Sequence, residues 1–202
     1  MKVTANDPRA IALASAAIAR GEVICLPTDT VYGIGADPFN ADAVTRLLTA
    51  KSRTRANPPP VLVAEGQAED LSEDISSAAR ALMKAFWPGA MTIVVPARAS
   101  IGWDLGETNG TVALRMPDSA TTLALLSAVG PLAVTSANQH GQPPATSVGE
   151  AMSQLGDAVS LYLDGGSGGG GVASTIVSVV GQPTILRQGA IGADAVWQAL
   201  AP

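Results

Sequence analysis

Short apolar runs alternate with segments of helical periodicity along most of this 202-residue chain. Residues 23–26 are typical of a buried strand, and residues 41–50 repeat apolar side chains at the three-to-four spacing of a helix. Three strand-like runs, 160–164, 174–180 and 183–187, cluster in the last third. The alternation predicts an α/β fold, and the clustered strands predict a mixed rather than a purely parallel sheet.

The remaining elements follow from the same patterns. The first helix has explicit signals, with Asp7 as its cap, Pro8 in its first turn and Gly21 after its end. We expect further helices at 77–86, 121–129, 150–156 and 194–200, and further strands at 61–64, 92–96, 111–114 and 131–135. No internal repeat or long linker divides the sequence, which predicts a single domain over residues 1–202.

The amino-acid composition argues against several kinds of binding site. A net charge of -5 and 3% aromatic residues speak against nucleic-acid binding by overall charge or by base stacking, so any RNA contact would have to be local. One cysteine and one histidine exclude an internal disulfide and a His-rich metal site. The apolar runs are too short to span a membrane, and a cytoplasmic location is expected.

Basic residues are unevenly distributed. Arg46, Lys51, Arg53 and Arg55 lie within ten residues, at the end of a predicted helix, and beyond Arg98 only two arginines remain. Those two, Arg115 and Arg187, each follow a predicted strand, from which they could reach a shared cleft. Two plainer explanations stay open: surface ion pairs for the two arginines, and attraction to the helix dipole for Lys51 and Arg53.

Small polar residues also follow two strands. Ser136 to Asn138 comes directly after the strand at 131–135, and Pro27 to Thr30 comes after the strand at 23–26. Hydroxyls and backbone amides in such turns can bind phosphate, although a simple turn or helix cap explains them equally well. His140 lies in a polar turn and is interpreted as a solvated loop residue, and the glycines at 165–171 as a flexible loop without the pattern of a P-loop.

Several of these pieces occur in a specific order between Gly21 and Ile191. They are PTDTVYGIGAD, KSR followed by NPPPVLV, WPGAMT, TVALRMP, TSAN, STIV and LRQGAI. In this order they resemble the YrdC-like threonylcarbamoyl-AMP synthases. The resemblance implies a twisted mixed sheet with flanking helices around a deep cleft. It also implies synthesis of threonylcarbamoyl-AMP and pyrophosphate from L-threonine, bicarbonate or CO2, and ATP, with Mg²⁺ carried by the ATP and no metal held by the protein.

The resemblance also assigns residues and partners. By similarity the catalytic residues are Lys51, Arg53, Ser136 and Asn138. The ATP site would comprise Lys51, Arg53, Asn57, Thr111, Ser136, Asn138, Pro144 and Arg187. The threonine site would comprise Thr30, Arg115, Val134 and Ser174. Downstream transferase proteins would move the threonylcarbamoyl group to tRNA.

The sequence departs from the family pattern in places. Thr54 stands where many members have Pro, Leu62 where several longer members carry a His near threonine, and His140 where a second Ser is common. The additional C-terminal domain of the longer members has no counterpart before Pro202, so a lid function is expected from elsewhere or not at all. Two alternatives remain: a paralogue that binds double-stranded RNA, and an enzyme of the same fold with a different acceptor amine.

Overall fold

The computed structural model describes residues 1–201 and contains one ten-stranded mixed sheet. The strands are β1 (Lys2–Thr4), β2 (Ile24–Leu26), β3 (Gly33–Ala36), β4 (Val61–Leu62), β5 (Met91–Pro96), β6 (Thr111–Arg115), β7 (Leu132–Ser136), β8 (Leu161–Asp164), β9 (Thr175–Ser178) and β10 (Thr184–Arg187). Their order across the sheet is β1-β8-β2-β3-β7-β4-β6-β5-β9-β10. Parallel pairs such as β5 with β9 occur beside antiparallel pairs such as β5 with β6, which confirms the expected mixed sheet.

Seven helices and two short 3-10 turns connect the strands within the described residues. The helices are α1 (Ala10–Ala19), α2 (Ala41–Ala50), α3 (Gln67–Leu71), α4 (Ser77–Phe86), α5 (Ala120–Val129), α6 (Val148–Leu155) and α7 (Ala193–Leu200). The two turns are η1 (Ala99–Ile101) and η2 (Gly156–Ala158). None of the helices in residues 1–201 is long and apolar enough to cross a bilayer.

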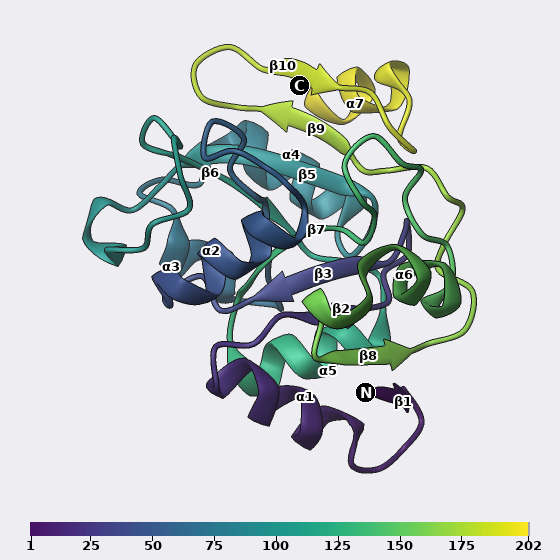
Figure 1. The fold of residues 1–202 in the computed structure, drawn as a ribbon. Coiled ribbons are helices and arrows are strands. Elements are labelled where there is room, and N and C mark those ends of the chain that lie inside the picture. The colour runs from purple at the N-terminus through teal and green to yellow at the C-terminus, as the bar shows by residue number, and fades with distance from the viewer. Residues whose placement is uncertain (202) are drawn as a thin grey trace.

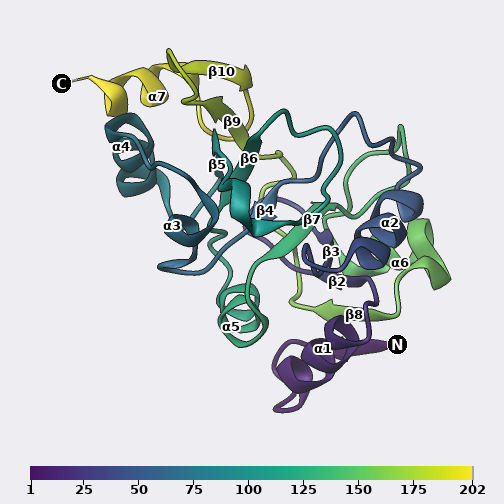
Figure 2. The same cartoon turned by 90° about the vertical axis from the view of Figure 1, so that its left-hand side faces the viewer.

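The two faces of the sheet have different covers. On one face, side chains from α2, α4, α6 and α7 form a single core with inward residues of the strands, for example Leu47, Leu82 and Ile93. On the other face α1 and α5 pack together over β8, β2 and β7, in a second core that includes Ile24 and Leu126 (Figures 1 and 2). Burial of these apolar faces accounts for the alternating pattern of the sequence.

The second face is only half covered by α1 and α5. In β6, β5 and β9, five of the residues that alternate with the core positions line a cavity: Ala113, Arg115, Thr92, Val94 and Ile176. The register supports this placement, because Val94 lies opposite Ala113 and Thr92 opposite Ile176. The twisted sheet therefore forms one wall of the deep cleft that the family resemblance implied.

Some elements differ from expectation. The first α-helix begins at Ala10 rather than at the Asp7-Pro8 signal. Asp7 instead caps the turn that precedes the helix: its carboxylate accepts from the Arg9 backbone at 2.8 Å and pairs with the Arg9 guanidinium. Strands β1 and β3 and helix α3 were not expected. In β3, glycine hides the strand pattern: a Cβ at Gly33 would lie 2.7 Å from a methyl carbon of Val134 on β7, so only glycine fits there.

The glycine-rich segment at 165–171 connects β8 to β9, as expected for a loop between strands. It is nevertheless tied to the rest of the fold by several hydrogen bonds. The Tyr32 hydroxyl accepts from the Gly165 amide at 3.0 Å and donates to the Gly166 carbonyl at 2.7 Å. The backbone of the segment also bonds Thr146 and Thr30. We call residues 165–171 the glycine strap.

Gly169 provides a test of how closely the glycine strap must approach the cavity wall. Its φ is +41°, and an added Cβ would lie 2.0 Å from the Asp29 carbonyl oxygen. Gly169→Ala should therefore lower the free energy of unfolding by at least about 1 kcal/mol. Gly170→Ala is the matched control, because a Cβ there meets nothing within 4 Å, and its effect should stay within about 0.5 kcal/mol. Urea denaturation of both variants measures the difference, and equal stabilities would contradict the close approach.

Candidate active site

The candidate site is a cavity of about 760 Å³ on the half-covered face of the sheet. Four cationic side chains line it: Lys51, Arg53, Arg115 and Arg187. Its lining, within the described residues, includes no aspartate or glutamate. A positively charged cavity in a chain of net charge -5 is suited to anionic ligands.

Lys51 follows the last residue of α2 and turns its amino group across the cavity to the end of β7. Its Nζ donates to the Asn138 side-chain oxygen at 2.6 Å and to the Asn138 carbonyl, and it lies 3.4 Å from Ser136 Oγ. Asn138 is held in turn by its amide group, which donates to the carbonyls of Gln139 and Gln142. Attraction to the helix dipole alone does not explain these contacts with another element.

Burial, and secondarily the positive charge of Arg53, lowers the pKa of Lys51 from its ordinary 10.5 to about 8. Burial also lowers the pKa of Arg53, and the charge of Arg187 lowers it further. Both effects disfavour the charged form, and the absence of carboxylates from the described lining leaves them uncompensated. An anion bound in the cavity would favour the charged forms of Lys51 and Arg53 and would raise their pKa values.

Arg53 and Arg187 line the cavity from different parts of the chain. Arg53 Nη1 donates to the Thr135 hydroxyl on β7 at 3.0 Å. Arg187, at the end of β10, donates from Nη2 to the Ser174 carbonyl at 2.7 Å and to the Ser174 hydroxyl at 3.1 Å. Neither arginine forms an ion pair within residues 1–201. The surface-pair explanation of Arg187 is therefore wrong.

Arg115 is buried at the end of β6 and is held on three sides. Its Nη2 pairs with Asp29 at 2.6 Å, its Nη1 donates to the Thr30 hydroxyl at 2.9 Å, and its Nε donates to the Gly89 carbonyl at 2.9 Å. Burial lowers the pKa of Arg115 more than the Asp29 carboxylate raises it. A guanidinium has five N–H groups, so two, one on each terminal nitrogen, have no partner among the described residues.

Ser174 lies just before β9 and faces the same cavity. Its hydroxyl is 2.8 Å from the hydroxyl of Thr92 on β5, and both residues are buried. Together with the Arg187 contact, this places Ser174 in a chain of three polar side chains.

The cavity brings together eleven of the sequence-predicted site residues. They are Thr30, Lys51, Arg53, Asn57, Arg115, Val134, Ser136, Asn138, Pro144, Ser174 and Arg187. Thr111 is not among the lining residues: it begins β6, and its hydroxyl donates to the Thr108 carbonyl at 2.8 Å. The ligand roles of the eleven lining residues and of Thr111 stay predictions. Leu62 and the exposed His140 also line the cavity.

Sequence reasoning assigned no site role to several polar residues at the cavity, Thr28 among them. Thr92 and Thr135 line it, and Asp29 holds Arg115 from behind. Thr92 and Thr135 lie inside apolar strand patterns, where a threonine is also an ordinary strand residue. The available signal was weak: each strand carries one threonine among mostly apolar residues.

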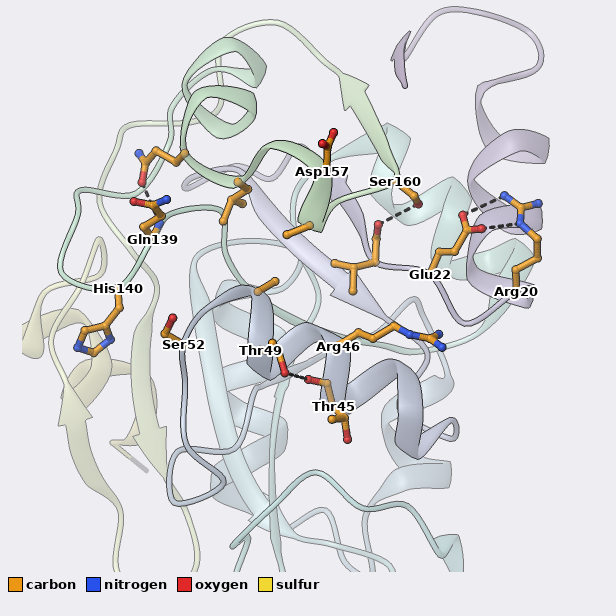
Figure 3. A pocket seen from close by; sticks show the side chains of 15 residues that line it. Arg20, Glu22, Thr45, Arg46, Thr49, Ser52, Gln139, His140, Asp157 and Ser160 are labelled. Carbon is orange, nitrogen blue, oxygen red and sulfur yellow. Dashed lines mark hydrogen bonds and ion pairs between the residues drawn. The ribbon is translucent and has the colours of Figure 1, made fainter.

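A larger cavity of about 890 Å³ lies beside α2 and shares Ser52 and His140 with the candidate site (Figure 3). Its charges are balanced, with Arg20 and Arg46 against Glu22 and Asp157. Arg20 pairs with Glu22 at 2.7 Å, as Figure 3 shows, so this arginine is already neutralised. Charge therefore distinguishes the smaller cavity as the anion site, although it is not the larger of the two.

The comparisons with known proteins agree with this geometry. A family model named Sua5_yciO_yrdC, described as "Telomere recombination", matches residues 16–189. The chain belongs to this Sua5/YciO/YrdC family. A Mycobacterium tuberculosis relative whose name includes "threonylcarbamoyl-AMP synthase" is 46% identical over 194 residues, 95% of this chain and 89% of that protein. The threonylcarbamoyl-AMP synthase of Bacillus subtilis is 38% identical over 205 residues, 100% of this chain and 59% of that protein.

Solved structures of the family have the same fold. The crystal structure of Pyrococcus abyssi Sua5 complexed with L-threonine matches with a TM-score of 0.91 and 32% identity, covering 99% of this chain and 60% of that one. Escherichia coli YciO matches with a TM-score of 0.86 over 97% of this chain and 98% of that one, at 24% identity, and it supports the fold alone.

The lowered pKa of Lys51 predicts how stability depends on pH. Between the folded pKa of about 8 and the ordinary value of 10.5, the unfolded chain binds more protons than the folded protein. The Lys51 contribution to the free energy of unfolding should therefore rise as pH rises through this window. Lys51→Met cannot titrate there and is the reference. Denaturation of both proteins from pH 7 to 10.5 should show the difference moving in favour of the wild type, and a falling difference would contradict the lowered pKa.

Proposed function

We infer that this protein is a threonylcarbamoyl-AMP synthase, a nucleotidyltransferase that forms threonylcarbamoyl-AMP and pyrophosphate from L-threonine, bicarbonate or CO2, and ATP. The observation that carries this inference is the group of four cations on one cavity whose described lining has no carboxylate. Related proteins of the family, 46% and 38% identical to this chain, are named for this activity. Neither the charge of the cavity nor these names favour the alternative of an RNA-binding paralogue.

The threonine end of the cavity is proposed to be the region around Arg115. Two N–H groups of this buried guanidinium have no protein partner in the hydrogen bonds of the described residues. A planar carboxylate accepts two parallel N–H bonds from such a fork. Thr30, Ser174 and Val134 surround the same part of the cavity lining and would contact the remainder of the amino acid.

The triphosphate is proposed to lie along Lys51, Arg53 and Arg187. Lys51 and Arg53 follow α2, Ser136 and Asn138 end β7 and the turn after it, and Arg187 ends β10. Asn57 and Pro144 would bound the nucleotide. Charge-assisted bonds to phosphate oxygens would compensate the burial cost of the cations.

The reaction itself asks mainly for positioning and charge neutralisation. The nitrogen lone pair of the neutral amine of threonine forms a bond to the carbon of CO2, one C–O π pair moves onto oxygen, and the nitrogen releases a proton to water, which gives a carbamate. A carbamate oxygen then attacks the α-phosphorus, and the bond from this phosphorus to the bridging oxygen of pyrophosphate breaks. Lys51 and Arg53, with Ser136 and Asn138 holding Lys51, would neutralise charge that develops on the phosphates.

Mg²⁺ enters this proposal as part of the substrate, the magnesium complex of ATP. The donor set of the cavity does not suit a resident divalent cation, because its described lining offers cations, hydroxyls and amides rather than carboxylates. We therefore derive no step through a metal held by the protein.

Other expectations for the protein remain predictions. They are the use of the product by downstream transferase proteins in tRNA modification, the cytoplasmic location, a local RNA contact and the ligand role of Thr111.

Two arginines near the end of α2 give a matched test of the phosphate assignment. Arg53 lines the cavity, whereas Arg55 pairs with Asp104 outside it and its side chain is 53% exposed. Arg53→Ala should weaken ATP binding by about 10- to 100-fold, because a charge-assisted bond is worth about 1.5–3 kcal/mol. Arg55→Ala should change it by less than about twofold. Calorimetric titration with ATP measures both, and equal losses would place the phosphates elsewhere.

The activity is tested directly by mass spectrometry. The wild-type protein incubated with ATP, Mg²⁺, bicarbonate and L-threonine should yield threonylcarbamoyl-AMP together with pyrophosphate. Omission of bicarbonate or threonine should remove both products. Pyrophosphate release with another amino acid but not with threonine would favour the enzyme with a different acceptor amine.

A further inference from the structure

Thr28 and Thr30 form a small hydrogen-bonded group on the wall of the cavity. Thr28 Oγ1 lies 2.6 Å from the Val31 carbonyl oxygen and 3.0 Å from Thr30 Oγ1. Both threonines are buried, with 7% and 3% of their surface exposed. Their protein partners therefore largely determine where their hydroxyl protons point.

The direction of the Thr28 hydroxyl follows from its partners. A carbonyl oxygen can only accept, so the 2.6 Å contact takes the single hydroxyl proton of Thr28. No other donor reaches the Val31 carbonyl within residues 1–201. Thr28 is then an acceptor toward Thr30 at 3.0 Å. The backbone N–H groups of Thr30 and Val31 approach the same oxygen at the longer distances of 3.2 and 3.3 Å and share its second lone pair.

The polarity of Thr30 follows in turn. Its hydroxyl proton goes to Thr28, and one of its two lone pairs accepts Arg115 Nη1 at 2.9 Å. One lone pair remains and no proton. Toward a ligand in the cavity, the Thr30 side chain can only accept a hydrogen bond.

We propose that Thr28 is a positioning residue that fixes the Thr30 hydroxyl as the acceptor for the amino N–H of the substrate amino acid. This rests on the proposed function, because it takes Arg115 as the group that binds the carboxylate. The amino group is attached to the carbon next to that carboxylate, and Thr30 Oγ1 accepts a hydrogen bond from Arg115. Of the two hydrogen-bonding groups of threonine beyond its carboxylate, the amine is one bond nearer to the carboxylate than the side-chain hydroxyl. An oxygen beside the carboxylate-binding guanidinium therefore suits the amine.

The fixed polarity has a chemical consequence for this reaction. The amine must attack CO2 with its nitrogen lone pair. A hydroxyl proton directed at the nitrogen would occupy this lone pair, whereas an acceptor binds an N–H and leaves it available. Thr28 thus excludes the unproductive orientation of Thr30 without touching the amine itself.

The test uses Thr28→Val, which keeps the shape of the side chain and removes its hydroxyl, with Thr28→Ser as the conservative variant. Calorimetric titration of the full chain should show about tenfold weaker binding of threonine by Thr28→Val, the loss expected for one hydrogen bond. 2-Aminobutyrate lacks the substrate hydroxyl but keeps the amine, so its affinity should fall by the same factor. ATP affinity should stay unchanged, and Thr28→Ser should restore both amino-acid affinities.

A double-mutant cycle separates this role from mere support of the turn. Because Thr28 acts through Thr30, Thr28→Val should cost nothing further for threonine binding in a Thr30→Val background. A full additional loss there would overturn the proposal, as would unchanged threonine binding by Thr28→Val alone. A loss confined to threonine and absent with 2-aminobutyrate would overturn the assignment to the amine. If Thr28→Val does not fold, Thr28→Ala takes its place in the same cycle with the same outcomes.

The experiments distinguish a failure of the positioning role from a failure of the proposed function. If the wild-type protein makes threonylcarbamoyl-AMP and Thr28→Val binds threonine normally, only the positioning role is wrong. If the wild-type protein binds no threonine, the function and the positioning role are both wrong.

Discussion

The site depends on keeping four cations close together in a cavity that offers them almost no negative charge. Among these four cations, within residues 1–201, only Arg115 has a carboxylate partner, Asp29. The others are held by neutral oxygens, such as Asn138 for Lys51 and Thr135 for Arg53. Within the described residues every buried side-chain nitrogen or oxygen has at least one hydrogen-bond partner, but most of the positive charge has no negative partner. The missing negative charge is what an anionic substrate contributes, and ligand binding should therefore also stabilise the fold.

Much of the fold could be predicted from the sequence because burial imposes a period on each element. The helices at 77–86 and 121–129 and the strands at 92–96 and 131–135 appear within a residue or two of their predicted bounds. Strand β3 could not be recognised, because Gly33 and Gly35 have low strand propensity. Both leave room for the Val134 side chain, which a Cβ at either position would crowd. The alternation of apolar and polar side chains reveals a strand only where side chains are present, and these two glycines have none.

The site was partly predictable for a different reason. Arg115 and Arg187 were expected at strand ends, and the family motifs named most of the lining residues. The role of Asp29 and the hydroxyl pairs could not be read from the sequence, because Asp29 and Arg115 are 86 positions apart and Thr92 and Ser174 are 82 apart. Such pairs depend on which strands become neighbours. The half-covered face of the sheet is likewise a property of how α1 and α5 are placed, not of any one segment.

The glycine strap has a geometric consequence for the whole sheet. It belongs to a ten-residue connection between β8 and β9, which lie seven strand positions apart in the sheet order. In a flat sheet that separation would be about 34 Å, since neighbouring strands lie about 4.8 Å apart. Ten residues reach about 35 Å only when fully extended. This connection instead contains three glycines in turns with positive φ, at 166, 169 and 171, so it spans much less. The connection therefore joins two distant strands of a curved sheet by a short path. Its length limits how far the sheet can flatten, and thereby how wide the cavity can open.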